Sequence, residues 1–457
     1  PQFGLARASR RDVLRVGGCG MLGLSMSALA QGRANTAALA AKARSVIFLY
    51  QFGGPSHVDT FDMKPEAADG LRSHFRPIAT KVPGTIVCEH LPEMAQVMDR
   101  VALVRSVHHT MKNHNPASYY ALTGRAPPVD DIRLPESLDL FPAYGSVVEH
   151  VAPARQGLAT FVAEPYLIRD GSITPGQGGS FLGPGFDPLL ITGDPNADAF
   201  QPPEFSLPEG IDPARLADRR EMQALIDSQA RLLDRSAHVQ GLEACYERAY
   251  GLINSTEVRQ AFELSAESEA TRLAYGRTTY GQSCLLARRL VEAGVKFVNV
   301  YFSGSIGGQT TTGGGWDTHG FGNTRMYPIL TANHLPLTNQ TLPVLLNDLE
   351  QRGLLDETLV VWMGEFGRTP KLNENISRDH WPHCYTVLLA GGGIRGGAIH
   401  GASDADGAFP IADPVRPDDL AATMFWLLGI DPATEIHDRL NRPWPIAAGQ
   451  PISSLVG

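Results

Sequence analysis

The sequence predicts an α/β fold in three layers, with a mostly parallel central sheet between two layers of helices. Two observations support this prediction. Several short apolar runs are continuous rather than alternating, which is typical of strands buried on both faces. These runs alternate along the chain with helical segments, and that order is typical of a mostly parallel sheet. At 457 residues and 43% hydrophobic, the chain is long enough for one large domain, expected over 31–457.

The expected elements follow from these patterns in chain order. The predicted strands are 45–52, 101–104, 295–302, 358–363 and 385–390. The predicted helices are 212–236, 239–250, 256–264, 281–293, 328–352 and 417–428. Residues 126–210 are rich in proline and glycine and show little periodicity. So long an irregular segment within a compact protein predicts an inserted cap or lid.

The N-terminus resembles a twin-arginine (Tat) export signal. The run Ser9-Arg10-Arg11-Asp12-Val13-Leu14 precedes a weakly apolar stretch that ends at a small-residue site, Ala28-Leu29-Ala30. We therefore expect 1–30 to be a signal peptide, cleaved after export through the Tat machinery to the periplasm or beyond. The alternative is a short amphipathic helix.

The charge and hydropathy of the remaining chain exclude two kinds of partner. The formal net charge is −9, and the body of the chain has no cluster of lysine and arginine that could neutralise phosphates, so no nucleic acid is expected. No later stretch reaches the roughly 18 apolar residues that a spanning helix needs. No transmembrane helix is therefore expected in the mature chain.

Histidine and acidic residues gather just after the predicted strands. They lie in four segments, namely 53–62, 108–114, 316–319 and 365–383. The carboxyl edge of a parallel sheet is where ligands bind, and divalent metal sites are assembled from carboxylates and imidazoles on separate loops. The alternatives are local: Asp59 and Asp62 as turn or cap residues, residues 317–319 as a helix cap, and His380 as a structural histidine.

Several long motifs, spread along almost the whole chain, resemble those of one family. They are GGPSHVDTFD, YYALTGR, GQGGSFLGPGFDP, WDTHG, MGEFGRTP, RDHWP and RPDDLAATMFWLLGIDP. The chain is identified by them as a member of the DUF1501 family, whose exported proteins are related to sulfatases within the alkaline-phosphatase superfamily. This resemblance implies the alkaline-phosphatase-like form of the three-layer fold.

The sequence departs from sulfatases at the reacting positions. The run from His114 to Arg125 resembles the sulfatase signature, but His114 stands where the formylglycine-forming cysteine would be and Ser118 where its arginine would be. Phe366 follows Glu365 where sulfatases have a metal-binding histidine. A sulfatase-type nucleophile is therefore absent from the signature.

The resemblance implies an exported, metal-dependent hydrolase of sulfate or phosphate esters. Its substrate would be a small anionic ester or a sulfated or phosphorylated glycan, and its cofactor a divalent metal ion such as Zn, Mn or Ca. The expected ligands are His57, Asp59, Asp317, His319, Glu365 and His380. The alternative is a non-catalytic binding or scaffold protein that retains the fold.

Three further residues are expected to take part in the reaction. Arg368 is expected to clamp an anionic group, because its planar fork makes two charge-assisted bonds to such oxygens. His114 is a nucleophile, a general acid or base, or another ligand. Ser56 is a weaker candidate nucleophile. A metal-activated water would need none of these side chains as nucleophile.

Overall fold

The computed structural model describes residues 39–155, 158–198, 200, 256–306, 314–321 and 325–457. All of its helices and strands lie in one compact unit, Ala41–Gly457. The expected signal peptide at 1–30 and the expected helices at 212–236 and 239–250 lie outside the described residues. No helix in the described ranges combines the length and the apolar character needed to cross a membrane.

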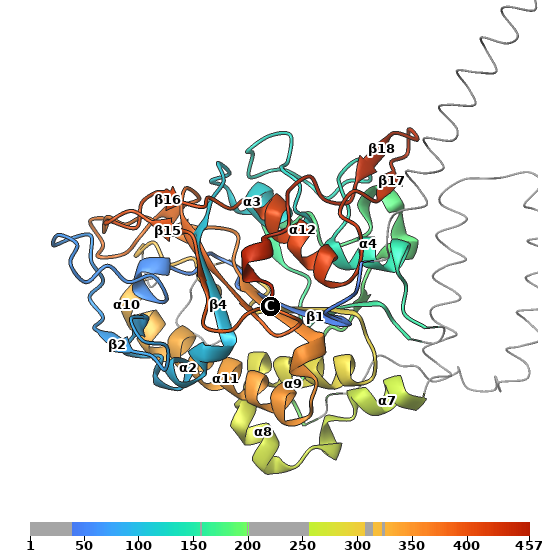
Figure 1. Cartoon of the computed structure of the whole chain (residues 1–457), viewed down its shortest axis with the longest axis horizontal. Coiled ribbons are helices and arrows are strands. Elements are labelled where there is room, and N and C mark those ends of the chain that lie inside the picture. The colour runs from blue at the N-terminus through green and yellow to red at the C-terminus, as the bar shows by residue number, and fades with distance from the viewer. Residues whose placement is uncertain (1–38, 156–157, 199, 201–255, 307–313, 322–324) are drawn as a thin grey trace, which may run out of the picture. The chain divides into compact units, whose positions relative to one another are not determined.

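An eight-stranded sheet forms the centre of the unit (Figure 1). Its strands run in the order β14-β4-β13-β10-β1-β9-β5-β8, and only β13 runs antiparallel to the others. Their bounds are Ile399–His400, Val101–Val107, Tyr385–Ala390, Thr358–Met363, Ser45–Tyr50, Phe297–Tyr301, Phe161–Glu164 and Leu189–Leu190, respectively. The predicted mostly parallel sheet is confirmed.

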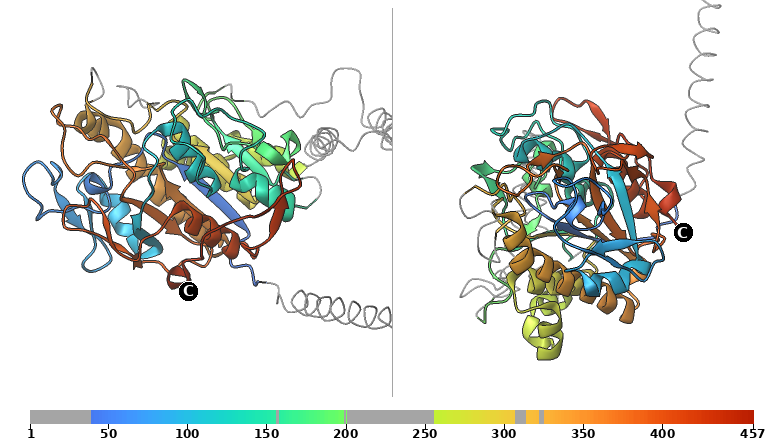
Figure 2. Two further views of the ribbon diagram at one scale, coloured as in Figure 1. Left: turned by 90° about the horizontal axis from the view of Figure 1, so that it is seen from above. Right: turned by 90° about the vertical axis from the view of Figure 1, so that its left-hand side faces the viewer.

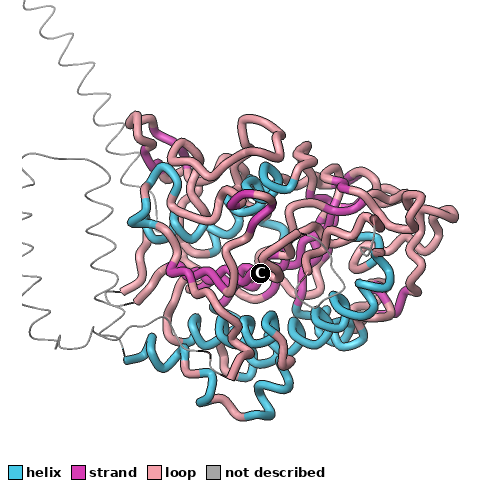
Figure 3. The backbone as a smooth tube through the Cα atoms, turned by 180° about the vertical axis from the view of Figure 1, so that it is seen from behind, coloured by secondary structure: helices cyan, strands magenta, loops and turns pink. Residues whose placement is uncertain are grey.

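Helices cover both faces of this sheet, which makes the three predicted layers (Figures 1 and 3). One layer contains α2 (Pro92–Val97), α9 (Thr279–Glu292) and α11 (Leu335–Gln351), packed over one hydrophobic core. The other contains α3 (His114–Thr123), α4 (Tyr144–Val151) and α12 (Pro417–Leu427), packed over a second core. In Figure 2 the yellow and orange helices of the first layer lie together on one side of the sheet.

The remaining elements are short. The other helices are α7 (Thr256–Phe262), α8 (Glu269–Tyr275) and α10 (Met326–Ile329). Within the described ranges, five two-stranded ribbons lie outside the main sheet: β2 (Pro77–Ala79) with β3 (Ile86–Cys88), β6 (Arg169–Asp170) with β7 (Ser172–Ile173), β11 (Gly367–Arg368) with β12 (His380–Trp381), β15 (Ala402–Ser403) with β16 (Pro410–Ala412), and β17 (Glu435–His437) with β18 (Pro443–Pro445).

The buried strands match the sequence prediction closely, and two segments differ from it. Strands β10 and β13 have the predicted bounds. The predicted helix 328–352 is divided by a π-helical turn at Leu330–His334. Such turns follow a change in the backbone hydrogen bonds that apolar periodicity does not reveal.

The segment 126–210 is less irregular than the sequence predicts. Its described part contains α4 and also β5 and β8, which form one edge of the central sheet. Strand β5 is only four residues long and ends in an acidic residue, Glu164, although all four residues are buried. A run this short in a proline-rich and glycine-rich context lacks the periodicity by which a strand is recognised. This part of the segment therefore belongs to the sheet rather than to an inserted cap.

Gly53 lets two loops meet at the carboxyl edge of β1. The Trp316 amide donates to the Phe52 carbonyl over 2.8 Å. Gly53 has a φ of +105°, and a Cβ there would lie 2.4 Å from the backbone nitrogen of Asp317. Only glycine combines this backbone angle with such close approach. Gly53, three residues after the end of β1, is therefore constrained by the segment that carries Asp317.

The substitution Gly53→Ala should destabilise the protein far more than Gly84→Ala. Both glycines have positive φ, but a Cβ at Gly84 meets nothing within 4 Å. Left-handed strain alone should cost about 1–2 kcal/mol in the Gly84 variant. The clash with Asp317 should bring the Gly53 cost to at least about 3 kcal/mol. Urea unfolding of both variants measures the difference, and equal losses would mean that the 316–317 segment moves away freely.

Candidate metal centre

The candidate site lies at the carboxyl edge of the parallel strands and takes its residues from three of them. His114 begins α3, seven residues after β4 ends. Asp317 comes after β9 in the sequence, and its backbone amide donates to the Ile306 carbonyl over 3.0 Å. His380 lies on β12, opposite Arg368 of β11 in the chain that follows β10. The fold thus brings together residues that are far apart in the sequence.

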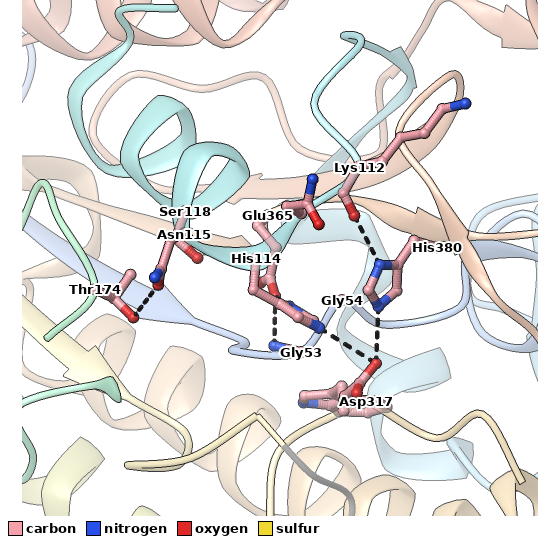
Figure 4. A network of polar contacts seen from close by, with 12 residues as sticks. Gly53, Gly54, Lys112, His114, Asn115, Ser118, Thr174, Asp317, Glu365 and His380 are labelled. Atoms are coloured by element: carbon pink, nitrogen blue, oxygen red, sulfur yellow. Dashed lines mark hydrogen bonds and ion pairs between the residues drawn. The ribbon is translucent and has the colours of Figure 1, made fainter. Parts of the chain in front are cut away.

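A single oxygen, Oδ1 of Asp317, is the point on which the site converges (Figure 4). Its distance is 2.8 Å to Nε2 of His319, 3.0 Å to Nε2 of His380 and 3.4 Å to Nε2 of His114. Nη2 of Arg368 lies 2.6 Å from the same oxygen. Burial raises the pKa of Asp317, but Arg368 and the histidines outweigh burial and hold that pKa well below its usual range. The carboxylate is therefore ionised.

The three histidines share one arrangement, because the other ring nitrogen of each contacts an oxygen that can only accept a hydrogen bond. These Nδ1 contacts are His114 to Glu365 Oε1 at 2.7 Å, His319 to Asp379 Oδ1 at 2.8 Å, and His380 to the Lys112 carbonyl at 2.7 Å. Each Nδ1 therefore carries the hydrogen, so in the neutral ring Nε2 presents its lone pair. Metal-binding histidines are typically oriented in this way.

The Nε2 atoms are arranged like the donor atoms of a metal site. Nε2 of His319 and Nε2 of His380 lie 3.0 Å apart. Two lone pairs at this distance repel each other unless a proton or a metal ion lies nearby. Nε2 of His114 is buried and has no hydrogen-bond partner in the described structure. Ligand atoms of His114, Asp317 and His380 all lie within 4.8 Å of one another, close enough to share one ion.

The pKa values of two of these histidines move in opposite directions. Burial lowers the pKa of His114, but the carboxylates of Asp317 and Glu365 outweigh burial and raise it to about 9. Burial lowers the pKa of His380 to about 4, and the positive charge of Arg368 contributes to the same shift. His380 is thus neutral near pH 7. A metal that binds through His114 must displace a proton from it.

Glu365 lies behind His114 rather than beside Asp317. Its side chain is fully buried. Oε1 accepts hydrogen bonds from His114 and from the Gly53 amide at 2.8 Å, and Oε2 accepts one from the Tyr50 hydroxyl at 3.2 Å. These contacts leave Glu365 to orient His114. Among the described residues, the group able to share one metal does not include Glu365, which the sequence predicts as a direct ligand.

Arg368 is held by backbone carbonyls as well as by Asp317. Nε donates to the Gly54 carbonyl over 3.0 Å, Nη1 to the Arg378 carbonyl over 3.3 Å, and Nη2 to the Gly53 carbonyl. The side chain is only 1% exposed. The guanidinium, which the sequence predicts as a clamp for an anionic group, thus has every nitrogen engaged within the protein.

Ser56, His57 and Asp59 form a separate buried group. Asp59 pairs with Arg378 over 2.6 Å, with both side chains fully buried, and also accepts a hydrogen bond from Ser56 Oγ over 2.5 Å. Nε2 of His57 donates to the Gly407 carbonyl over 2.7 Å. Among the described residues, the group able to share one metal includes none of the three. The structure therefore does not bring these predicted site residues to Asp317.

Two residues outside the predicted site set shape the site. Asp379 orients His319, and Phe366 is a fully buried wall whose ring centroid lies 4.4 Å from that of His380 and 5.1 Å from that of His114. Asp379 directly precedes His380, but its role depends on the pairing of β11 with β12. No local sequence pattern predicts the pairing of β11 with β12.

The fold and the site together define an α/β protein with a candidate metal centre at the carboxyl edge of its sheet. The chain belongs to the family described as "Protein of unknown function (DUF1501)", whose model matches residues 43–456. A comparison with curated proteins finds no match.

Several solved structures are similar to this chain over most of its length. The PsFucS1 sulfatase from Pseudoalteromonas sp. has 11% identity and a TM-score of 0.40, with 84% of this chain and 68% of that chain covered. A mutant of the alkaline phosphatase PafA has 10% identity and a TM-score of 0.43, with 91% and 99% covered. A protein in the alkaline phosphatase superfamily from Vibrio parahaemolyticus has 10% identity and a TM-score of 0.38, with 85% and 67% covered.

The substitution Asp59→Asn should destabilise the protein without weakening metal binding. It leaves the Arg378 guanidinium buried with no negative partner, which should cost about 3–5 kcal/mol. The matched control is Asp69→Asn, which breaks an exposed pair with Arg72 and should change stability by less than about 1 kcal/mol. Chemical unfolding and metal titration are the measurements. Loss of metal with stability unchanged would place Asp59 among the ligands after all.

Proposed function

We propose that this protein is an exported, metal-dependent hydrolase of sulfate or phosphate esters. The observation that carries the proposal is the convergence of three imidazole Nε2 atoms on one oxygen of Asp317. Each imidazole is fixed by an acceptor on its other nitrogen. Nitrogen donors held in this way, next to a carboxylate, are typical of catalytic metal sites.

The donor set supports zinc or manganese more than calcium. Imidazole nitrogens suit zinc and other transition metals, whereas calcium takes six to eight oxygen ligands. Here His114, His319 and His380 supply nitrogen, and Asp317 supplies oxygen. Three of these residues lie within the limits for sharing one ion, and His319 contacts two of them. We therefore propose that a single Zn or Mn ion is held here.

Such a metal, when bound, polarises a sulfuryl or phosphoryl oxygen and helps to supply the nucleophile. The residues of the chain do the rest. Glu365 and Asp379 hold two of the histidine rings in place, while Arg368 fixes the Asp317 carboxylate through its own ties to backbone carbonyls. Phe366 keeps the inner side of the site apolar, which strengthens every charge interaction near it.

Water is the proposed nucleophile. His114 occupies the position of the sulfatase cysteine, but its Nδ1 is bonded to Glu365 and its Nε2 is assigned here to the metal, so neither ring nitrogen is left to attack the ester. Ser56 Oγ donates to Asp59, within a separate buried group. Neither side chain therefore offers a free nucleophile. Export rests on the twin-arginine-like segment at 9–30, and the proposed substrate is a small anionic ester or a sulfated or phosphorylated glycan.

One observation favours the alternative of a metal-binding protein without catalysis. All three nitrogens of the Arg368 guanidinium contact protein oxygens, so its fork is not free for a substrate anion. A hydrolase of this type would have to hold its substrate by the metal ion and by other groups. Activity measurements on the metal-loaded protein distinguish the two candidates.

Metal content should depend on Asp317 and His380. The purified mature protein, reconstituted with Zn or Mn, should hold about one ion per chain, and Asp317→Asn or His380→Ala should abolish tight binding. Asp379→Asn removes the carboxylate that accepts from His319 and from Asn373, and it should weaken affinity by about 10-fold to 100-fold. The exposed Asp406→Asn variant should bind like the parent. Elemental analysis and competition with a chelating dye measure both effects, and metal-free parent protein after reconstitution would refute the proposal.

The metal-loaded parent should hydrolyse aryl sulfates or aryl phosphates, and removal of the metal by a chelator should stop the reaction. Re-addition of the same ion should restore it, while Asp317→Asn should stay inactive at every metal concentration. A chromogenic ester assay measures the rates. A parent that binds metal tightly but hydrolyses no ester in such a screen would support the non-catalytic alternative instead.

A further inference from the structure

We propose that the side chains of Trp381, His383 and Phe409 form an aromatic platform that binds one sugar of an anionic glycan, next to the sugar that carries the ester. This inference rests on the proposed hydrolase function. It specifies the substrate as an oligosaccharide rather than a single small ester. The aromatic platform lies outside the groups that hold the candidate metal centre together.

The three rings of the aromatic platform pack against one another at the surface. Their centroids are 4.8 Å apart for Trp381 and His383, 5.5 Å for Trp381 and Phe409, and 5.8 Å for His383 and Phe409. Phe409 is 51% exposed, and the other two side chains are half-buried. Neither Trp381 nor Phe409 belongs to the two hydrophobic cores of the described structure. The rings therefore present apolar surface to solvent instead of filling the interior.

Hydrogen bonds hold the aromatic platform in one shape. Nε1 of Trp381 donates to the Ala408 carbonyl over 2.6 Å. The Asp404 carboxylate accepts from the amides of Ala408 over 2.7 Å and of Phe409 over 3.2 Å. The Asp404 amide donates to the Phe409 carbonyl over 2.8 Å, which closes the turn between β15 and β16. Because these rings are already fixed, little conformational entropy is lost when a ligand binds to them.

The aromatic platform is a direct neighbour of the candidate metal centre. Trp381 follows His380 on β12, and consecutive Cα atoms lie about 3.8 Å apart. Side chains of consecutive strand residues point to opposite faces, so the Trp381 ring lies beside the centre and does not line it. The His109 amide donates to the Pro382 carbonyl over 2.8 Å, which fixes the residue before His383 to the segment after β4. One chain of sugars can therefore reach both places, with one sugar at the metal and the next on the rings.

Positive charges lie beside the aromatic platform. The Lys112 carbonyl contacts Nδ1 of His380 over 2.7 Å, while its side chain extends away from the centre (Figure 4). Burial lowers the pKa of His383, and the charge of Lys112 lowers it further, so this ammonium group acts on the platform. Arg416 is exposed and follows the residue whose carbonyl accepts the His108 amide over 2.9 Å. A sulfate or phosphate group on the bound sugar is attracted to these two cations.

The size and chemistry of the aromatic platform favour a sugar over a protein partner. A fully buried aromatic side chain covers about 150–250 Å², so three rings that are already partly buried offer a few hundred Å² at most. A stable protein interface needs about 800 Å² on each partner. A sugar ring is small enough for this area, and it has an apolar C–H face for the rings and polar edges for the charged groups.

The test measures the binding of two probes to the metal-loaded protein by titration calorimetry. The probes are a dextran sulfate oligosaccharide and an uncharged dextran oligosaccharide of the same length. The parent should bind the sulfated probe more tightly. Phe409→Ala should raise its Kd by about 10-fold, because the most exposed ring of the platform is lost. Phe409→Tyr keeps a ring and should bind like the parent. The matched control is Leu273→Ala, a side chain 54% exposed on α8, which should leave the Kd unchanged.

Hydrolysis supplies a second readout for the same variants. The value of kcat/KM for a sulfated oligosaccharide should fall by about 10-fold in Phe409→Ala, since the remote sugar contributes binding energy. For a small aryl sulfate it should change by less than about 2-fold, because such an ester contacts the metal centre alone. An equal fall for both esters would show a structural role for Phe409 and would overturn the inference.

The remaining outcomes separate this inference from the function on which it rests. Equal Kd values for Phe409→Ala and the parent, or equal losses in Phe409→Ala and Phe409→Tyr, overturn the aromatic platform while hydrolysis of aryl esters still supports the function. Equal affinity for both probes overturns the assignment to an anionic glycan. A parent that binds the sulfated probe through Phe409 but hydrolyses no ester overturns the proposed hydrolase function and leaves a glycan-binding protein.

Discussion

The structure of the site depends on one carboxylate oxygen, Oδ1 of Asp317, which attracts three imidazoles and one guanidinium at once. Its place is set by backbone rather than by side-chain contacts. The amide of the preceding residue, Trp316, donates to the Phe52 carbonyl just after β1, and the Asp317 amide donates to the Ile306 carbonyl. Gly53 has no side chain, and a Cβ there would clash with the Asp317 backbone. Because these backbone contacts are made at the carboxyl edge of the central strands, the sheet determines where the charge of Asp317 lies.

Around this oxygen, the Nε2 atoms of the histidines face the proposed metal position, and other groups hold the histidine rings in place. Glu365, Asp379 and a backbone carbonyl fix the outer nitrogens of the histidines, and Phe366 closes the inner side. Arg368 complicates this arrangement, since its guanidinium contacts the Asp317 oxygen that the proposed metal ion would use, and its positive charge would repel that ion. Its ties to three backbone carbonyls prevent it from turning away. Its charge is therefore a fixed feature of the site.

The sequence predicts the sheet well and the site in part. Strands β10 and β13 are uninterrupted buried runs, and such runs are recognised without knowledge of their partners. Residues that follow different parallel strands were expected to meet, which accounts for Asp317, His319 and His380. The group at Ser56, His57 and Asp59 also follows a strand, but Arg378 pairs with Asp59. That pairing depends on long-range packing near β12, which no local pattern of the sequence reveals.

The central claim is that His114, Asp317 and His380 hold one divalent metal ion. Anomalous diffraction from crystals of the metal-loaded protein, recorded above and below the absorption edge of the metal, tests it most directly. The account predicts a single strong peak among the Nε2 atoms and Asp317, at about 2.0–2.2 Å from its ligands if the ion is zinc. A peak beside Asp59 and His57, or none at the Asp317 carboxylate, would contradict it.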